Sequence, residues 1–362
     1  MVAFIGTVGT TSGRARSVRP QRCPTRQRRV LVKAEFFDAW SRRCIPEPNL
    51  RKVVDALQNV AIELAEQIGA APITKIQGHA AGMNASGDSQ KELDVIANHA
   101  FKRACEASGC VSVMASEEDE QPVEIPSTIG PGDVGIPSYV VCFDPLDGSR
   151  NIESSIPTGS IFGIYAYRPD LGVEANVLQP GINQVAAGYI LFSSATQMVL
   201  TTGSGAHIFT VDWQTRRFVC TSESIHMPKR GQVYSLNDAR YFDWPKGLQD
   251  YIDTIRQGKG ENAGKKYSAR YVCSLVADFH RTLYTGGWAG NPRSHLRLVY
   301  EANPLAFIAE QAHGRGSDGK RRILEIQPAA LHQRLPLFLG SSDDLNELEK
   351  YDVQQKDGSY DV

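Results

Sequence analysis

Residues 139–149 read Tyr-Val-Val-Cys-Phe-Asp-Pro-Leu-Asp-Gly-Ser and join a compact apolar run to two carboxylates. The first five residues are apolar without interruption, as in a strand that is covered on both faces. Asp144 and Asp147 follow directly, where such a strand would end. In α/β sheets, ligands bind at the carboxyl ends of strands. The segment therefore predicts an α/β protein with an acidic site at one edge of a sheet.

Acidic side chains recur at two other predicted element ends. A β-rich run at 111–115 leads into Ser-Glu-Glu-Asp at 116–119, and Gly-Asp at 87–88 opens a predicted helix that carries a further acid. Taken singly, each piece is better explained as a solvated loop start or a helix cap. Brought together at one place, the carboxylates would repel one another unless cations neutralised them. These acids are Asp88, Asp94, Glu117, Glu118 and Asp119.

The ligand chemistry of such a site follows from the residue types around it. No His or Cys lies near any of these acids in the sequence. Oxygen ligands without nitrogen or sulfur favour Mg²⁺, with Mn²⁺ as the alternative, over zinc. Multi-carboxylate magnesium sites mostly serve phosphoryl chemistry. The sequence thus predicts a metal-dependent enzyme that acts on a phosphate ester.

The cysteines indicate no further metal site. There are seven of them, with no CxxC pair and no His at zinc-finger spacing, so neither a structural zinc nor a disulfide framework is expected. Cys142 and Cys273 lie in apolar or mixed runs, and we predict both as buried packing residues.

The hydrophobic patterns predict two domains. Helical periodicity runs from Asn49 to Gly69 and again between Gly87 and Gly109, while the acidic, Pro- and Gly-rich segment 119–138 is predicted as a long loop. We place a boundary near Lys229, which gives domains of 35–228 and 229–362. The other predicted strands are 161–167, 188–202, 207–211 and 217–221, and the predicted C-terminal helices are 244–256 and 304–312.

The charge distribution is uneven. The 362 residues carry a net charge of −1, but residues 1–34 hold eight Lys or Arg and no acid, leaving 31 basic against 40 acidic residues in the rest. An acidic body argues against a nucleic-acid partner, and no apolar run approaches the ~18 residues of a membrane span. The basic, Ser- and Thr-rich first 34 residues are typical of an organelle transit peptide cleaved near Ala34, with an unaddressed basic arm as the alternative.

These acidic motifs resemble the shared signature of the lithium-sensitive sugar and inositol phosphatases. Further motifs narrow the resemblance to the fructose-1,6-bisphosphatase family over about residues 50–345. With the basic N-terminus, the chain is similar to a plastid form, although segment 119–138 has no cysteine and so cannot hold the redox disulfide of the thioredoxin-regulated form. The narrowing motifs lie at 151–152, 159–165, 187–189, 234–237, 269–271, 280–283, 296–304 and 331–334.

The resemblance implies a fold, a reaction and an assembly. The fold would be a layered αβαβα sandwich with two tightly packed domains. The reaction would be Mg²⁺-dependent hydrolysis of the 1-phosphate of fructose 1,6-bisphosphate in the plastid stroma, with two or three ions per subunit. The protein would be a homodimer or homotetramer that binds a small sugar bisphosphate, with no nucleic-acid or membrane partner.

It also implies roles for individual residues. Asp94 and Glu118 would activate the attacking water, and the backbone of Gly148 and Ser149 would bind the 1-phosphate. Glu301 is promoted by the family pattern alone, because 300–304 otherwise reads as an ordinary helix start. The implied metal ligands are Asp88, Glu117, Glu118, Asp144, Asp147, Glu301 and the carbonyl of Leu146. The implied substrate-binding residues are Asp147, Gly148, Ser149, Arg150, Asn237, Arg270, Tyr271, Arg293, His295 and Arg297.

Several positions depart from the family pattern. Arg150 stands where a second Ser is usual, while Asn291 and His295 stand where a Tyr and a Lys contact the distal phosphate, in a loop that is shorter than usual. Arg270 is expected to reach a neighbouring subunit's site, and we expect Arg293 to supply the charge lost at His295. Two alternatives remain, namely sedoheptulose 1,7-bisphosphatase activity through the altered loop, and a catalytically weakened paralogue that binds sugar phosphates.

Overall fold

The computed structural model describes residues 35–74, 79–83, 89–126 and 138–355. Within these residues the strands form a nine-stranded sheet, a five-stranded sheet and the small pair β2 (His79–Met83) and β3 (Ser89–Lys91). The large sheet has the order β1 (Glu35–Phe36), β11 (Arg217–Ser222), β10 (Ala206–Asp212), β9 (Gln197–Thr201), β8 (Gln184–Phe192), β7 (Thr158–Ala166), β6 (Tyr139–Asp147), β4 (Val111–Ser116), β5 (Val123–Glu124). The small sheet has the order β13 (Ser268–Ala269), β12 (Val233–Ser235), β14 (Trp288–Arg297), β16 (Arg334–Ser341), β15 (Gly314–Ser317).

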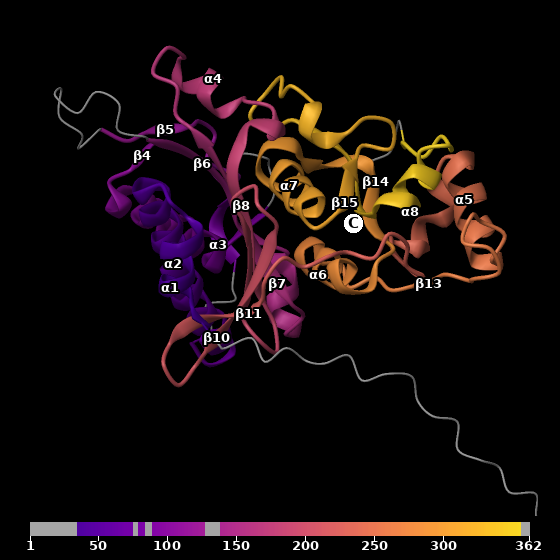
Figure 1. Ribbon diagram of the computed structural model, residues 1–362, viewed down its shortest axis with the longest axis horizontal. Coiled ribbons are helices and arrows are strands. Elements are labelled where there is room, and N and C mark those ends of the chain that lie inside the picture. Colours follow the sequence, from indigo (N-terminus) through magenta and orange to yellow (C-terminus); the bar gives the residue numbers. More distant parts are fainter. Residues whose placement is uncertain (1–34, 75–78, 84–88, 127–137, 356–362) are drawn as a thin grey trace, which may run out of the picture. The chain divides into compact units, whose positions relative to one another are not determined.

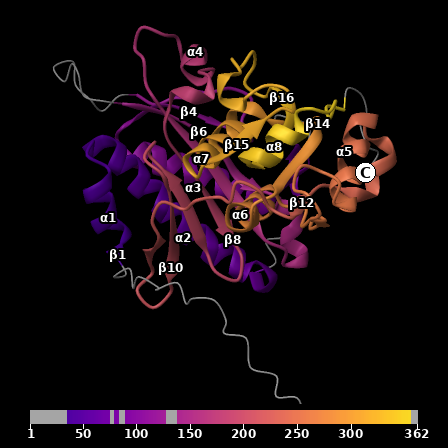
Figure 2. The ribbon, with the colours of Figure 1, turned by 45° about the vertical axis from the view of Figure 1, so that its right-hand side comes forward.

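Helices cover both faces of each sheet, which gives five alternating layers and confirms the predicted αβαβα sandwich. One outer layer packs on the large sheet and is seen beside β10 in Figure 2, a middle layer lies between the sheets in Figure 1, and another outer layer covers the small sheet. The outer layer on the large sheet is α1 (Phe37–Cys44), α2 (Pro48–Thr74) and α3 (Glu92–Ser108). The middle layer is α6 (Leu275–Thr285) and α7 (Asn303–Gln311), the last layer is α5 (Lys246–Gln257) and α8 (Ser342–Leu348), and α4 (Val173–Val177) flanks β4 and β6.

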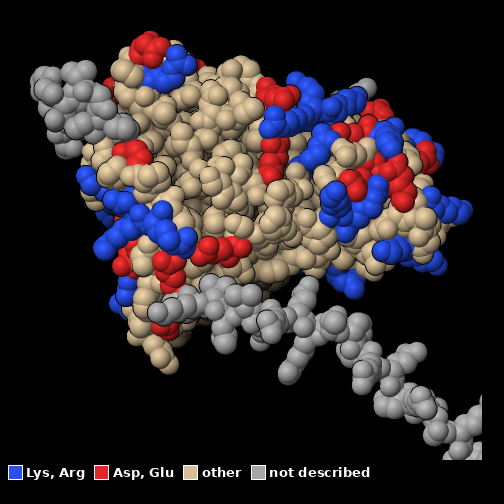
Figure 3. Space-filling view, in the orientation of Figure 1, with Lys and Arg blue, Asp and Glu red and all other residues tan. Residues whose placement is uncertain are grey.

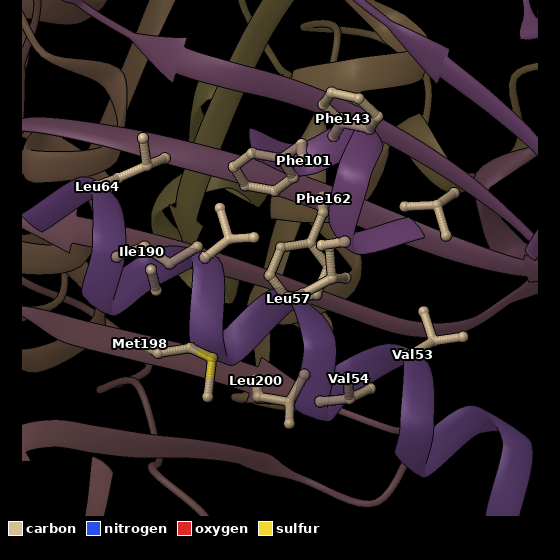
Figure 4. Packing of buried hydrophobic residues seen from close by; sticks show 14 of the residues in the cluster. Val53, Val54, Leu57, Leu64, Phe101, Phe143, Phe162, Ile190, Met198 and Leu200 are labelled. Carbon is tan, nitrogen blue, oxygen red and sulfur yellow. The ribbon is translucent and has the colours of Figure 1, made fainter. Parts of the chain in front are cut away.

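The apolar face of α2 explains why this helix forms and where it docks. Its buried side chains recur at intervals of three and four residues, the period of one helical face. Figure 4 shows Val54, Leu57 and Leu64 of this face packed toward β7, β8 and β9. The helix continues past Gly69, where the sequence predicted its end, because Ala71 in the next turn is fully buried. Packing there outweighs the propensity cost of glycine, which is about 1 kcal/mol.

The central strands are buried on both faces, as the unbroken apolar runs predicted. In β7, Phe162 and Ile164 face the outer helices, whereas Ile161 packs toward α6 and α7. The predicted strand at 188–202 is wrong as a single element, because residues 193–196 form a turn between the antiparallel strands β8 and β9. Its Ser-Ser-Ala-Thr sequence carried the turn signal that the apolar flanks obscured.

Charged side chains gather mainly on the outer layer of the small sheet. Figure 3 shows basic and acidic residues intermixed over the part of the surface where Figure 1 places α5 and α8. Lys246 pairs with Asp250 there, and Lys350 pairs with Glu261. Exposed pairs of this kind contribute at most about 1 kcal/mol, so apolar side chains such as Leu248 hold this layer in place. Among the described residues, no helix has the length and apolarity needed to cross a membrane.

We expect Phe162→Ala to lower the free energy of unfolding by about 3–5 kcal/mol, because the ring is fully buried between β7 and the outer helices. The matched control is Phe242→Ala, whose ring is 89% exposed and whose loss should change stability by no more than about 0.5 kcal/mol. Urea unfolding followed by circular dichroism measures both. Equal effects of the two variants would contradict the assigned packing.

Candidate metal centre and active site

Two strand ends bring the predicted acids together. β4 and β6 are parallel neighbours, with Ser116 opposite Phe143 in the register. The N–H of Glu117 donates to the carbonyl of Phe143 at 3.0 Å and extends this ladder by one residue. Because the strands run in the same direction, Glu117 and Asp144 leave the sheet at the same edge. The grouping expected from the sequence is therefore present.

Asp144, Asp147 and Glu301 form a compact cluster. One carboxylate oxygen from each lies within 4.8 Å of the others. The end of β6 bends between the two aspartates, where Asp144 accepts the N–H of Leu146 at 3.0 Å and the Pro145 carbonyl accepts the hydroxyl of Ser160 at 2.7 Å. Glu301 comes from η4 (Leu298–Ala302), a turn of π-helix that leads into α7. The β6 end and η4 together thus present three acids to one point.

Arg297 lies at the edge of this cluster. Its guanidinium pairs with Glu117, and its backbone N–H donates to Glu301 at 2.5 Å. Both side chains of the ion pair are nearly inaccessible to solvent. The residue, which we predicted to bind substrate, therefore contacts two predicted metal ligands.

Burial and mutual repulsion perturb these acids. Burial raises the pKa of Asp144 well above its usual range, and the charges of Glu117, Asp147 and Glu301 raise it further. Burial likewise raises the pKa of Asp147 to about 6 and that of Glu301 to about 8, although Arg297 opposes the rise at Glu301. Four carboxylates face a single guanidinium in this cluster, so added positive charge would stabilise it. The donor set fits a hard divalent cation such as Mg²⁺ or Mn²⁺.

Asp94 lies at the start of α3. Its Oδ2 accepts the N–H of Lys91 at 2.8 Å and the hydroxyl of Ser149 at 3.3 Å. Its Oδ1 is buried and has no hydrogen-bond partner among the described residues. Burial raises the pKa of this carboxyl group. Asp88 lies outside the described residues.

The turn after β6 requires a glycine. Gly148 has φ = 75°, in the left-handed region, and precedes η1 (Ser149–Ser154), a 3₁₀ helix. Asn151 in η1 donates to the carbonyl of Cys273 at 2.8 Å, which ties this turn to the segment before α6. Arg150 is exposed at the start of η1. Gly148 and Ser149 thus lie between Asp94 and the α6 segment.

α6 contributes a contact that sequence reasoning missed. The N–H of Val276, in its first turn, donates to Asp147 Oδ2 at 3.3 Å. Ser274 caps the helix by accepting the N–H of Ala277 at 3.4 Å. The spacing of Ser274 before an apolar run was a helix-start signal.

The predicted distal substrate residues come from three segments. Asn237 precedes η3 (Asp238–Asp243), and Arg270 and Tyr271 follow β13. Arg293 and the exposed His295 lie in β14, at the register irregularity between Asn291 and Leu296. Arg270 is exposed, with its guanidinium on the carbonyl of Ala269.

The cysteine predictions are half right. Cys142 is fully buried, as expected. Cys273 is exposed, which corrects the prediction, and it accepts the Tyr271 hydroxyl at 3.2 Å. Its φ of 62° belongs to a tight turn before α6, and this turn lifts the thiol out of the core. The six cysteines within the described residues are all free.

Comparison with known proteins agrees with this architecture. The family model for the N-terminal domain of fructose-1-6-bisphosphatase matches residues 38–223, and that for the C-terminal domain matches residues 227–353. The chain is 42% identical to chloroplastic fructose-1,6-bisphosphatase of Brassica napus, with 84% of this chain and 77% of the relative covered. It is 41% identical to the class 1 fructose-1,6-bisphosphatase of Chlorobium chlorochromatii, with 91% and 97% covered. The holo crystal structure of Leishmania major fructose-1,6-bisphosphatase superposes with a TM-score of 0.81 at 35% identity, covering 88% of this chain and 98% of that one.

The layered fold and the matching family models define the protein as a phosphatase. The chain belongs to the fructose-1,6-bisphosphatase family.

We expect the metal-free protein to lose stability as the pH rises. The folded pKa values of Asp147 and Glu301, about 6 and about 8, exceed the values of about 3.9 and 4.3 in unfolded chains, so the folded state holds more protons. The free energy of unfolding should therefore fall from about pH 4 until the pH passes the folded pKa near 8, and Mg²⁺ or Mn²⁺ should restore it. Thermal unfolding in EDTA, with and without added ion, measures both effects.

Glu301→Gln removes one of these charges and should flatten the decline between pH 6 and pH 8. A melting temperature that rises with pH over this interval in EDTA would contradict the buried, repelling cluster.

Proposed function

We propose that this protein hydrolyses the 1-phosphate of fructose 1,6-bisphosphate in a Mg²⁺-dependent reaction that yields fructose 6-phosphate and phosphate. The observation that carries this proposal is the Asp144–Asp147–Glu301 cluster beside Glu117, because these buried oxygens suit a divalent ion. The family and its relatives, which are named fructose-1,6-bisphosphatase, support the substrate.

We assign the ion ligands to the strand ends and η4. Glu117, Glu118, Asp144, Asp147, Glu301 and the carbonyl of Leu146 would hold two or three ions, with Asp88 assisting. When bound, the ions supply positive charge that offsets the charge of the phosphoryl oxygens. Mg²⁺ is the favoured ion, and Mn²⁺ fits the same donors.

Asp94 and Glu118 are assigned to accepting the proton of the attacking water. Asp94 Oδ1 suits this role because it has no hydrogen-bond partner among the described residues, while Oδ2 is held by Lys91 and Ser149. Its raised pKa strengthens it as a proton acceptor. The backbone N–H groups of Gly148 and Ser149 would bind the 1-phosphate.

The distal phosphate is assigned to the segments around β13 and β14. Asn237, Tyr271, Arg293 and His295 would bind it, with Arg270 acting in the neighbouring subunit of a homodimer or homotetramer. The short loop 290–294 also favours a second candidate, hydrolysis of sedoheptulose 1,7-bisphosphate, because a longer sugar needs more room there. A catalytically weakened paralogue is disfavoured by the retained acidic cluster.

We further propose that the first 34 residues direct the protein to the plastid stroma. Their basic, hydroxyl-rich composition and the chloroplastic relatives support this, while the bacterial relative of similar identity shows that the body of the chain does not depend on a plastid. The division into domains at 228 and 229 remains part of the same proposal.

Phosphate release by the purified chain tests the reaction. We expect hydrolysis of fructose 1,6-bisphosphate that requires Mg²⁺ and is unchanged by dithiol reductant, and a loss of at least about 100-fold in kcat for Glu301→Gln, which removes a proposed ligand. Glu310→Gln is the matched control, since Glu310 lies in α7 and pairs with Arg322. Faster turnover of sedoheptulose 1,7-bisphosphate would select the second candidate, and no turnover of either substrate would select the paralogue.

Arg293→Ala tests the distal phosphate. We expect KM to rise about 10-fold with kcat little changed, because a distal contact made equally in the ground and transition states affects binding alone. Arg168→Ala is the control, since Arg168 pairs with Asp170 on the surface. If Arg293→Ala is silent and His295→Lys lowers KM as the pH rises through the ordinary His pKa of about 6.5, Arg293 does not compensate for the missing Lys.

A further inference from the structure

His332 lies in the turn that precedes β16, within a sequence motif to which no role has been assigned. The side chain is half-buried, and its Nε2 lies 3.1 Å from the backbone carbonyl of Asp119. Because a carbonyl only accepts, Nε2 carries the proton in this bond. Burial and the charges of Arg297 and Arg334 lower the pKa of His332, which favours the neutral ring with this single donor.

Asp119 closes the turn that carries Glu117 and Glu118. Its N–H donates to the carbonyl of Ser116 at 3.3 Å, and the N–H of Glu118 donates to the Ser116 hydroxyl at 3.2 Å. The Asp119 carboxylate accepts bonds from two residues of α3, which are Asn98 at 3.0 Å and Lys102 at 2.8 Å. His332 adds a bond from the opposite side, so the turn is held between α3 and the segment before β16.

The same short segment also holds the start of η4, which carries Glu301. The carbonyl of Gln333 accepts the N–H of Leu298 at 2.8 Å, one residue before Arg334 pairs with Arg297 in the register of β14 and β16. The rings of His332 and Tyr300 lie 5.5 Å apart between centroids. Two adjacent residues, His332 and Gln333, therefore link the β4 turn to η4.

We propose that His332 is a positioning residue that fixes the Glu117–Glu118 turn relative to Glu301. The inference rests on the proposed function of these acids as a metal centre. Repelling carboxylates from the two sheets share the centre, so their spacing has to be held by bonds outside it. Second-shell partners of metal ligands typically change affinity or activity by about 10- to 100-fold when removed.

His332→Leu tests this, with Mn²⁺ binding followed by electron paramagnetic resonance alongside kinetics on fructose 1,6-bisphosphate. We expect Mn²⁺ affinity to fall about 10-fold and kcat to fall about 10- to 100-fold, while KM changes less than about 2-fold. His332→Gln, whose amide can donate to the Asp119 carbonyl, should stay within about 3-fold of wild type. Asn98→Ala removes another anchor of the same turn and should give a milder loss of the same kind.

His207→Leu is the matched control, because this buried imidazole also contacts a carbonyl, that of Ser204 at 3.3 Å, in the β9–β10 region rather than in the segments that hold the acids. It should lower the melting temperature without changing Mn²⁺ affinity or kcat. Wild-type Mn²⁺ affinity and kcat in His332→Leu, or equal losses in His332→Leu and His332→Gln, would overturn the proposal. If wild-type protein releases no phosphate, the proposed reaction fails, but the Mn²⁺ titrations still decide the role of His332.

Discussion

The repulsion among carboxylates at the ends of two parallel strands is the constraint on which the rest of the site depends. Glu117 and Asp144 leave β4 and β6 at the same edge, and Asp147 and Glu301 close the cluster from the β6 bend and from η4. No folded chain gains stability by burying these groups charged and unpaired. The site therefore makes physical sense as a receptor for cations, with Arg297 as a fixed partial counter-charge.

The five-layer architecture holds these acids in place from opposite sides. The large sheet supplies the strand ends, α6 supplies a backbone N–H to Asp147, and the small sheet supplies the β14 end that leads to Glu301. Burial of β6 and β7 on both faces makes this frame rigid. A centre assembled from two sheets needs links between them, and the His332–Gln333 segment is one such link.

The sequence predicted the parts of the site that follow from strand direction and failed where tertiary contacts decide. Glu117 and Asp144 were found because apolar runs end at acids. Glu301 gave no local signal, since a π-helical turn before α7 has the sequence of an ordinary helix start. The turn that exposes Cys273 depends on left-handed backbone at a non-glycine residue, and the linking role of His332 depends on a carbonyl more than 200 residues away. Neither is encoded in local periodicity.

The central claim is that these acids share protons without a cation and release them when one binds. Calorimetric titration of Mn²⁺ into metal-free protein, in buffers of different ionisation enthalpy, counts those protons directly. With pKa values of about 8 for Glu301 and well above the usual range for Asp144, we predict release of about one proton or more per subunit at pH 7. Binding with no proton release at pH 7 would contradict the account.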